Sequence, residues 1–115
     1  MKRSKFWLLT TCIILVGITI LSLLPPKSGL EIHSNDKVNH FVAYACLTFS
    51  GLAAKILKRE FGMVLFIILF GILMEWLQGF VPGRDQSFFD TVANILGVGI
   101  GFFIYRSLRR LSFMN

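Results

Sequence analysis

Four long apolar runs, at residues 6–24, 38–57, 61–80 and 88–105, are separated by short polar segments. An α-helix rises about 1.5 Å per residue, so roughly 20 apolar residues are needed to cross a hydrocarbon core of about 30 Å. Each run meets or nearly meets that length. The pattern predicts an all-α membrane protein, a compact bundle of four transmembrane helices in a single domain covering residues 1–115.

The amino-acid composition supports a membrane protein. Hydrophobic residues make up 55% of the 115 residues and charged residues only 16%, whereas soluble domains average about 45–50% and 25%. Mean hydropathy is +0.71. The two cysteines, Cys12 and Cys46, fall inside apolar runs, so we expect small buried side chains and no disulfide.

The positive charges flank the apolar runs. This arrangement accounts for the net charge of +6 and argues against nucleic-acid binding, which needs a basic surface interleaved with aromatic residues. Nine of the twelve Lys and Arg residues fall in the two terminal segments and the loop at 58–60 or beside it. The positive-inside rule therefore predicts that both termini and this loop are cytoplasmic.

The first run could instead be a signal peptide, because basic residues precede it. The run is longer than the roughly 7–15 residues of a signal-peptide apolar region, and no small-residue cleavage site follows it. Pro25-Pro26 fits the end of a helix that leaves the bilayer. We therefore predict that the first helix is retained.

Polar side chains form a stripe on each of the last three predicted helices, with spacings of three and four residues that place each set on one helix face. Their polar members lie toward the predicted outer end, and their glycines lie toward the inner end. The stripes comprise His40, Tyr44, Leu47 and Gly51; Gly71, Glu75 and Gln78; and Asp90, Asn94, Gly97 and Gly101. Small residues at such spacing indicate close helix packing, so the glycines are expected to be structural.

Ionisable groups inside a bilayer are costly and should face the bundle interior or a wet cavity. Three titratable groups at one depth therefore indicate a functional site, with His40, Glu75 and Asp90 as candidate catalytic acid–base groups. The candidate substrate-binding residues are Asp36, Lys37, Tyr44, Gln78, Arg84 and Asn94. An Arg guanidinium is well suited to hold phosphate or carboxylate. A single His makes a metal site the weaker alternative, and no cofactor is expected.

The order and spacing of these residues resemble a known family. Asp36-Lys37-x-x-His40-x-x-x-Tyr44, Glu75-x-x-Gln78, Pro82-x-Arg84 and Asp90-x-x-x-Asn94-x-x-Gly97 together are similar to the VanZ-like family, named for a protein associated with teicoplanin resistance. The similarity runs from Asp36 to about Gly101. It implies a compact bacterial membrane protein, linked in the founding member to reduced action of a glycopeptide that binds cell-wall precursors.

The sequence thus predicts a protein of the bacterial plasma membrane whose outward-facing polar site binds or processes a lipid-linked cell-envelope precursor or a phospholipid head group. The candidate acid–base residues would suit a hydrolase or a transferase. No obvious nucleophile accompanies them, because Ser87 lies in a loop. A non-catalytic lipid- or antibiotic-binding protein, or a modulatory subunit, is the alternative. Ion or proton transport is disfavoured because no acidic relay continues toward the inner side. The oligomeric state is open.

Overall fold

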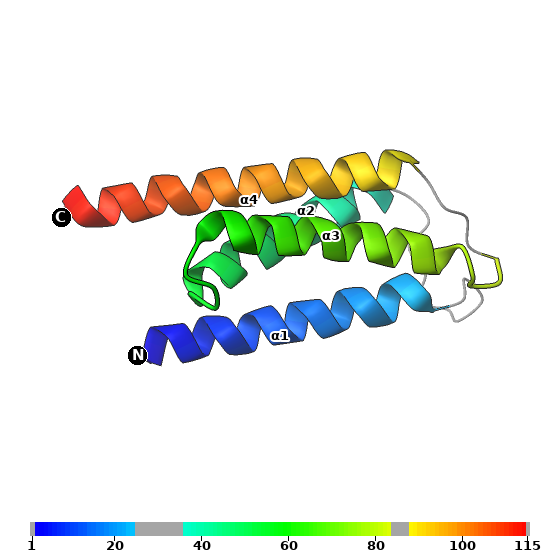
Figure 1. Ribbon diagram of the computed structural model, residues 1–115, viewed down its shortest axis with the longest axis horizontal. Coiled ribbons are helices and arrows are strands. Elements are labelled where there is room, and N and C mark those ends of the chain that lie inside the picture. Colours follow the sequence, from blue (N-terminus) through cyan, green and yellow to red (C-terminus); the bar gives the residue numbers. More distant parts are fainter. Residues whose placement is uncertain (1, 25–35, 84–87, 115) are drawn as a thin grey trace.

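The computed structural model describes residues 2–24, 36–83 and 88–114, apart from the side chains of residues 2, 36, 37 and 112–114. Four helices follow one another along the chain: α1 (Lys2–Leu23), α2 (Asp36–Ala53), α3 (Glu60–Gln78) and α4 (Phe88–Met114). They run alternately up and down in an elongated bundle of 50 × 25 × 23 Å (Figure 1).

The two ends of this bundle differ. Both chain termini and the α2–α3 loop lie at one end, where α1 and α3 begin and α2 and α4 finish (Figure 1). We call this the basic end, because every Lys and Arg side chain that the structure describes belongs to it. The opposite end, formed by Leu23, Asp36, Gln78 and Phe88, is called the polar end.

Three of the helices are long and apolar enough to cross a membrane: Arg3–Leu23, Glu60–Gln78 and Phe88–Leu111. The apolar part of α2, Val38–Ala53, is shorter than that criterion. The predicted set of four helices is confirmed, and spanning length is confirmed for three of them.

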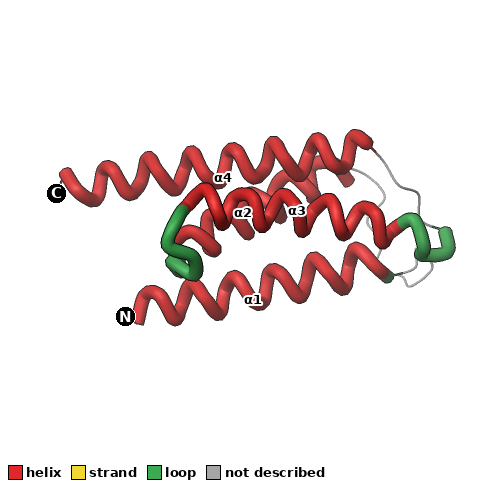
Figure 2. The backbone as a smooth tube through the Cα atoms, in the orientation of Figure 1, coloured by secondary structure: helices red, strands yellow, loops and turns green. Residues whose placement is uncertain are grey.

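The predicted end of the second helix, at residue 57, is wrong by four residues. The chain turns at Ala54 and Lys55, and Lys55 adopts a left-handed backbone conformation with φ 54°. The Lys55 amide bonds the Leu52 carbonyl at 3.1 Å, a three-residue closure that ends the α-helical ladder. Figure 2 shows this loop at the basic end.

The fourth helix is longer than predicted, because it continues to Met114 rather than ending near residue 105. The apolar run stops at Tyr105, but the residues that follow contain no Gly or Pro and several strong helix formers. The helix therefore extends beyond the apolar segment.

Helix α2 lies at the centre of the bundle and packs most extensively on α4. Tyr44 and Leu47 are almost completely buried, as is Thr48. A Cβ atom at Gly97 would lie 2.3 Å from the Phe41 carbonyl oxygen, and one at Gly101 would lie 2.4 Å from the Ala45 carbonyl oxygen. Both glycines thus permit backbone-to-backbone contact between α4 and α2, as predicted from their spacing.

The outer faces of the bundle are apolar. Large side chains such as Leu9, Phe61 and Phe103 are more than 60% exposed. Trp76 is also exposed. The expectation that both cysteines are buried is wrong, because Cys12 and Cys46 lie on the outer surface as free thiols.

Candidate functional site

His40 of α2 joins two side chains of α4 at the polar end. Its Nδ1 lies 2.9 Å from Asn94 Oδ1, and its Nε2 lies 3.8 Å from Asp90 Oδ2. A carboxamide oxygen can only accept a hydrogen bond, so Nδ1 carries the proton that is donated to Asn94. Nε2 faces the Asp90 carboxylate, and the two form an ion pair only when the ring carries a second proton.

The position of each partner follows from its helix. Asp90 lies in the first turn of α4, where the positive end of the helix dipole stabilises a carboxylate by about 0.3–1 kcal/mol. Asn94 follows one turn later on the same face. The side chains of His40 and Asp90 retain 19% and 12% of their exposure, so Asp90 is buried and His40 is the more accessible of the two.

Tyr44, Glu75 and Asn94 form the buried part of the site. A Cβ atom at Gly71 of α3 would lie 3.1 Å from the Tyr44 ring and 3.4 Å from Asn94 Nδ2, so the bare glycine lets α3 approach both side chains. Glu75, one turn further along α3, is buried and interacts electrostatically with Tyr44. Tyr44 is 2% exposed, which excludes a role as a simple interfacial aromatic.

Gln78 has a structural partner. Its Nε2 donates a hydrogen bond to the Ser22 carbonyl oxygen at 3.1 Å, and Gln78 is buried. Ser22 lies in the last turn of α1, where backbone carbonyls have no partner within the helix. Gln78 therefore ties α1 to α3 at the polar end. Sequence reasoning missed this contact, because any residue type can supply a backbone carbonyl.

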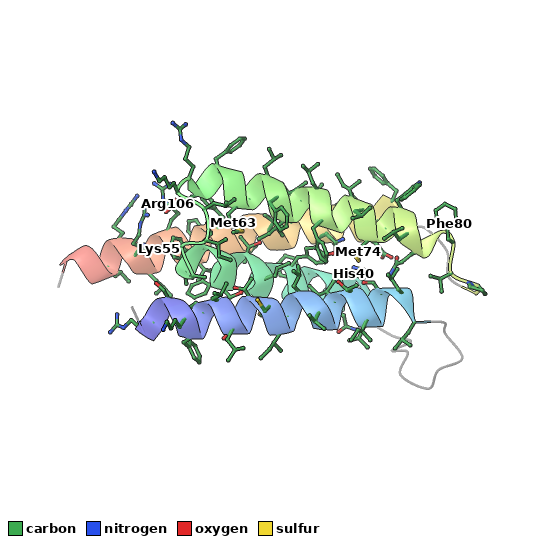
Figure 3. The ribbon with its side chains drawn as sticks, turned by 60° about the horizontal axis from the view of Figure 1, so that its bottom comes forward. His40, Lys55, Met63, Met74, Phe80 and Arg106 are labelled. Carbon is green, nitrogen blue, oxygen red and sulfur yellow. The ribbon has the colours of Figure 1, made fainter. Side chains whose placement is uncertain are left out.

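The structure thus brings together a polar cluster from three helices. Its members are His40, Tyr44, Glu75, Asp90 and Asn94. Gln78 follows Glu75 on α3, but its described hydrogen bond runs to α1. Figure 3 places His40 toward the end of the bundle that carries Phe80, away from Lys55 and Arg106.

Three predicted site residues cannot be located in the same way. Arg84 and the side chains of Asp36 and Lys37 lie outside the described residues, so their predicted roles in binding stay predictions. Within the described part of the chain, no group of three His, Cys, Asp or Glu side chains is arranged to hold a metal ion.

Charges are strongly segregated between the two ends. The described basic side chains all belong to the basic end: Arg3, Lys5, Lys55, Lys58, Arg59, Arg106, Arg109 and Arg110. Glu60 lies among them and pairs with both Arg106, at 3.3 Å, and Arg109. Glu75, Asp90 and His40 belong to the other half of the bundle. This distribution matches the pattern that the positive-inside rule describes.

The chain is similar to an uncharacterized protein of the fission yeast Schizosaccharomyces pombe. The two are 32% identical over 92 residues, which cover 76% of this chain and 57% of the yeast protein. This chain therefore spans little more than half the length of that relative. No family model matches the chain, and no solved structure matches it.

Proposed function

We propose that this protein is a VanZ-like, multi-pass membrane protein whose polar cluster binds the head group of a membrane lipid or lipid-linked envelope precursor at the extracytoplasmic face. Segregation of the described Lys and Arg side chains supports an orientation with the basic end in the cytoplasm. In a bacterium the membrane concerned would be the plasma membrane.

All four helices are proposed to lie within the bilayer. Helix α2 has 18 residues and is therefore about 27 Å long, close to the hydrocarbon thickness of about 30 Å. It lies between α1, α3 and α4, so its short apolar part is largely shielded from lipid by protein. A modest mismatch at the polar end costs only fractions of a kcal/mol per Å.

The observation that carries the proposal is the partly accessible His40 ring, which lies 3.8 Å from the Asp90 carboxylate beside a buried polar network. The described part of the cluster contains two carboxylates and one imidazole. That composition suits a hydroxyl or amine group of a ligand, which can donate to Asp90. A phosphate on the same ligand would need a cation, and Arg84 and Lys37 are the candidates from the sequence. A phosphate-bearing head group with an amine or hydroxyl combines these requirements.

Binding is favoured over catalysis because the five members of the polar cluster include no Ser, Thr or Cys nucleophile. The His40–Asp90 pair nevertheless keeps hydrolysis open as a second candidate, since it could activate a water molecule as a general base. Proton transport finds less support, because the inner members of the stripes, Leu47, Gly97 and Gly101, cannot relay protons.

The similarity to a fission yeast protein helps to choose the ligand that should be tested first. Similarity that extends to a fungus favours a head group shared by the membranes of different organisms. For that reason a phospholipid head group is the first ligand to test, ahead of a bacterial cell-wall precursor and any role in glycopeptide resistance.

The test uses glycerophosphoethanolamine, a head group without acyl chains, and full-length protein in detergent with 13C-labelled histidine. Titration should shift the His40 ring resonances. Asp90→Asn should weaken binding about tenfold, because a hydrogen bond to a charged group is worth roughly 1.5–3 kcal/mol. Glu60→Gln, a matched change at the basic end, should leave the affinity within twofold.

Equal affinities of Asp90→Asn and wild type would contradict the proposed site. Release of free ethanolamine or phosphoethanolamine from the probe, lost in His40→Gln while binding persists, would reassign the protein as a hydrolase. Asp90→Asn and His40→Gln must first match the wild-type protein in gel-filtration elution and in helical content in the same detergent.

A further inference from the structure

A second feature is separate from the polar cluster and extends from the basic end to about the middle of the bundle. A groove of about 320 Å³ runs between α3 and α4. Val64 and Ile68 line it from α3, and Ile95, Gly99 and Phe102 line it from α4. Its volume is within the range of roughly 300–1,000 Å³ that is typical of sites for small molecules.

Gly99 leaves the floor of this groove open. A Cβ atom at Gly99 would have no neighbouring atom within 4 Å, in contrast to Gly97 and Gly101, whose Cβ positions collide with α2. The middle glycine of the Gly97-Val98-Gly99-Ile100-Gly101 segment therefore faces away from the α2–α4 contact, and packing between the described helices does not account for it.

The groove is about as long as the hydrocarbon layer of one membrane leaflet is thick. It extends from Glu60 to Ile68 along α3 and from Ile95 to Arg106 along α4. At 1.5 Å per residue these segments cover roughly 12–17 Å, about half of a hydrocarbon core of about 30 Å. An acyl chain from the leaflet at the basic end would fit this span.

Arg106 marks the mouth of the groove. Its guanidinium lies 5.5 Å from the centre of the Phe102 ring and 3.3 Å from Glu60, and its side chain is 46% exposed. Glu60 also pairs with Arg109, so one carboxylate faces two guanidinium groups. Exposed Lys58 and Arg59 directly precede Glu60 and add to the positive charge.

We propose that this groove binds one acyl chain of an anionic phospholipid, with Arg106 holding its phosphate. Arg is suited to phosphate because its planar guanidinium donates two parallel hydrogen bonds. Excess positive charge at the mouth selects an anionic over a zwitterionic head group. A second copy of the chain in the same orientation would bring like charges together at this end, so charge complementarity favours the lipid.

The acyl-chain half of the proposal is tested by filling the groove. Gly99→Leu places a side chain in the open space, whereas Gly17→Leu makes the same change on α1, where a Cβ atom also meets nothing within 4 Å. Native mass spectrometry would count phosphatidylglycerol and phosphatidylcholine molecules of identical acyl chains retained by the full-length protein. Gly99→Leu should lower retention of phosphatidylglycerol about tenfold, since several methylene contacts of about 0.8 kcal/mol each are lost, and Gly17→Leu should not.

The head-group half is tested with Arg106→Gln against Arg110→Gln, an exposed arginine that does not line the groove. Arg106→Gln should lower the preference for phosphatidylglycerol over phosphatidylcholine about fivefold, as expected for one cation near a membrane surface. Arg110→Gln should change it less than twofold.

Equal retention by Gly99→Leu and Gly17→Leu, or an unchanged lipid preference in Arg106→Gln, would overturn the proposal. So would a wild-type dimer in light scattering that Gly99→Leu dissociates, because the occupant would then be a second copy. These outcomes are independent of the polar cluster, since the glycerophosphoethanolamine probe has no acyl chain.

Discussion

Two glycines of α4 that are two residues apart should respond oppositely to the same small substitution. Gly97→Ala places a methyl group 2.3 Å from the Phe41 carbonyl oxygen and 3.1 Å from its carbon. An ordinary carbon–oxygen contact is about 3.3 Å or longer, so α4 must retreat from α2 by about 1 Å at this point. The obstacle is backbone, which cannot rotate away. Gly99→Ala adds its methyl group to open space.

The expected difference follows from two contributions. Replacing Gly by Ala inside a helix gains up to about 0.8–1 kcal/mol of helix propensity, and this gain is shared by both variants. Overpacking a well-packed interface costs typically about 1–3 kcal/mol, and only Gly97→Ala incurs it. Gly97→Ala should therefore be about 1–3 kcal/mol less stable than Gly99→Ala.

The consequence should reach the polar cluster. Asn94 lies three residues before Gly97 on the same face of α4 and bonds His40 at 2.9 Å. A retreat of about 1 Å would break a hydrogen bond of that length. Gly97→Ala should therefore also weaken binding of the head-group probe, whereas Gly99→Ala should retain it.

Denaturant titration of both variants in the same detergent gives the free energies of unfolding, and the glycerophosphoethanolamine titration gives the affinities. If the two variants unfold within about 0.5 kcal/mol of each other, a value typical of neutral surface substitutions, close packing at Gly97 does not hold α2 and α4 together. The assignment of the polar cluster to that interface would then be wrong.

Further predictions concern single contacts. Gln78→Ala removes the bond to the Ser22 carbonyl and should lower stability by about 0.6–1.7 kcal/mol, the range for polar contacts between membrane helices; unchanged unfolding would refute its role in holding α1. A double-mutant cycle of His40→Ala and Asn94→Ala should give a coupling of about 0.5–1.5 kcal/mol, and additive effects would refute the bond. Glu60→Gln loses two partly exposed ion pairs and should lower stability by about 0.4–2 kcal/mol at low salt, less at high salt.

Much of the bundle could be predicted because the apolar runs are long and the polar positions repeat every three or four residues. The spacing of His40 and Tyr44, and of Asp90 and Asn94, put each pair on one face, and the structure shows those faces in contact. The role of Gly97 followed from the small-residue pattern, since close approach of two helices is the main use of that pattern within a membrane.

Other features lack a sequence signal. Helix α2 ends through a left-handed Lys55, a conformation usually adopted by Gly or Asn, so residue type did not mark the helix end. The partner of Gln78 is a backbone carbonyl. The groove beside Gly99 depends on how α3 and α4 pack against each other, which only the packed structure reveals.

The side of the membrane that the polar end faces is tested most directly by cysteine labelling in intact cells. Cys12 and Cys46 are first replaced by Ala, and single cysteines are introduced at Pro82, in the turn after α3, and at Lys58, in the basic loop. A membrane-impermeant maleimide should label position 82 in intact cells and position 58 only after permeabilisation. Labelling of position 58 in intact cells, with position 82 protected until permeabilisation, would contradict an outward-facing polar site.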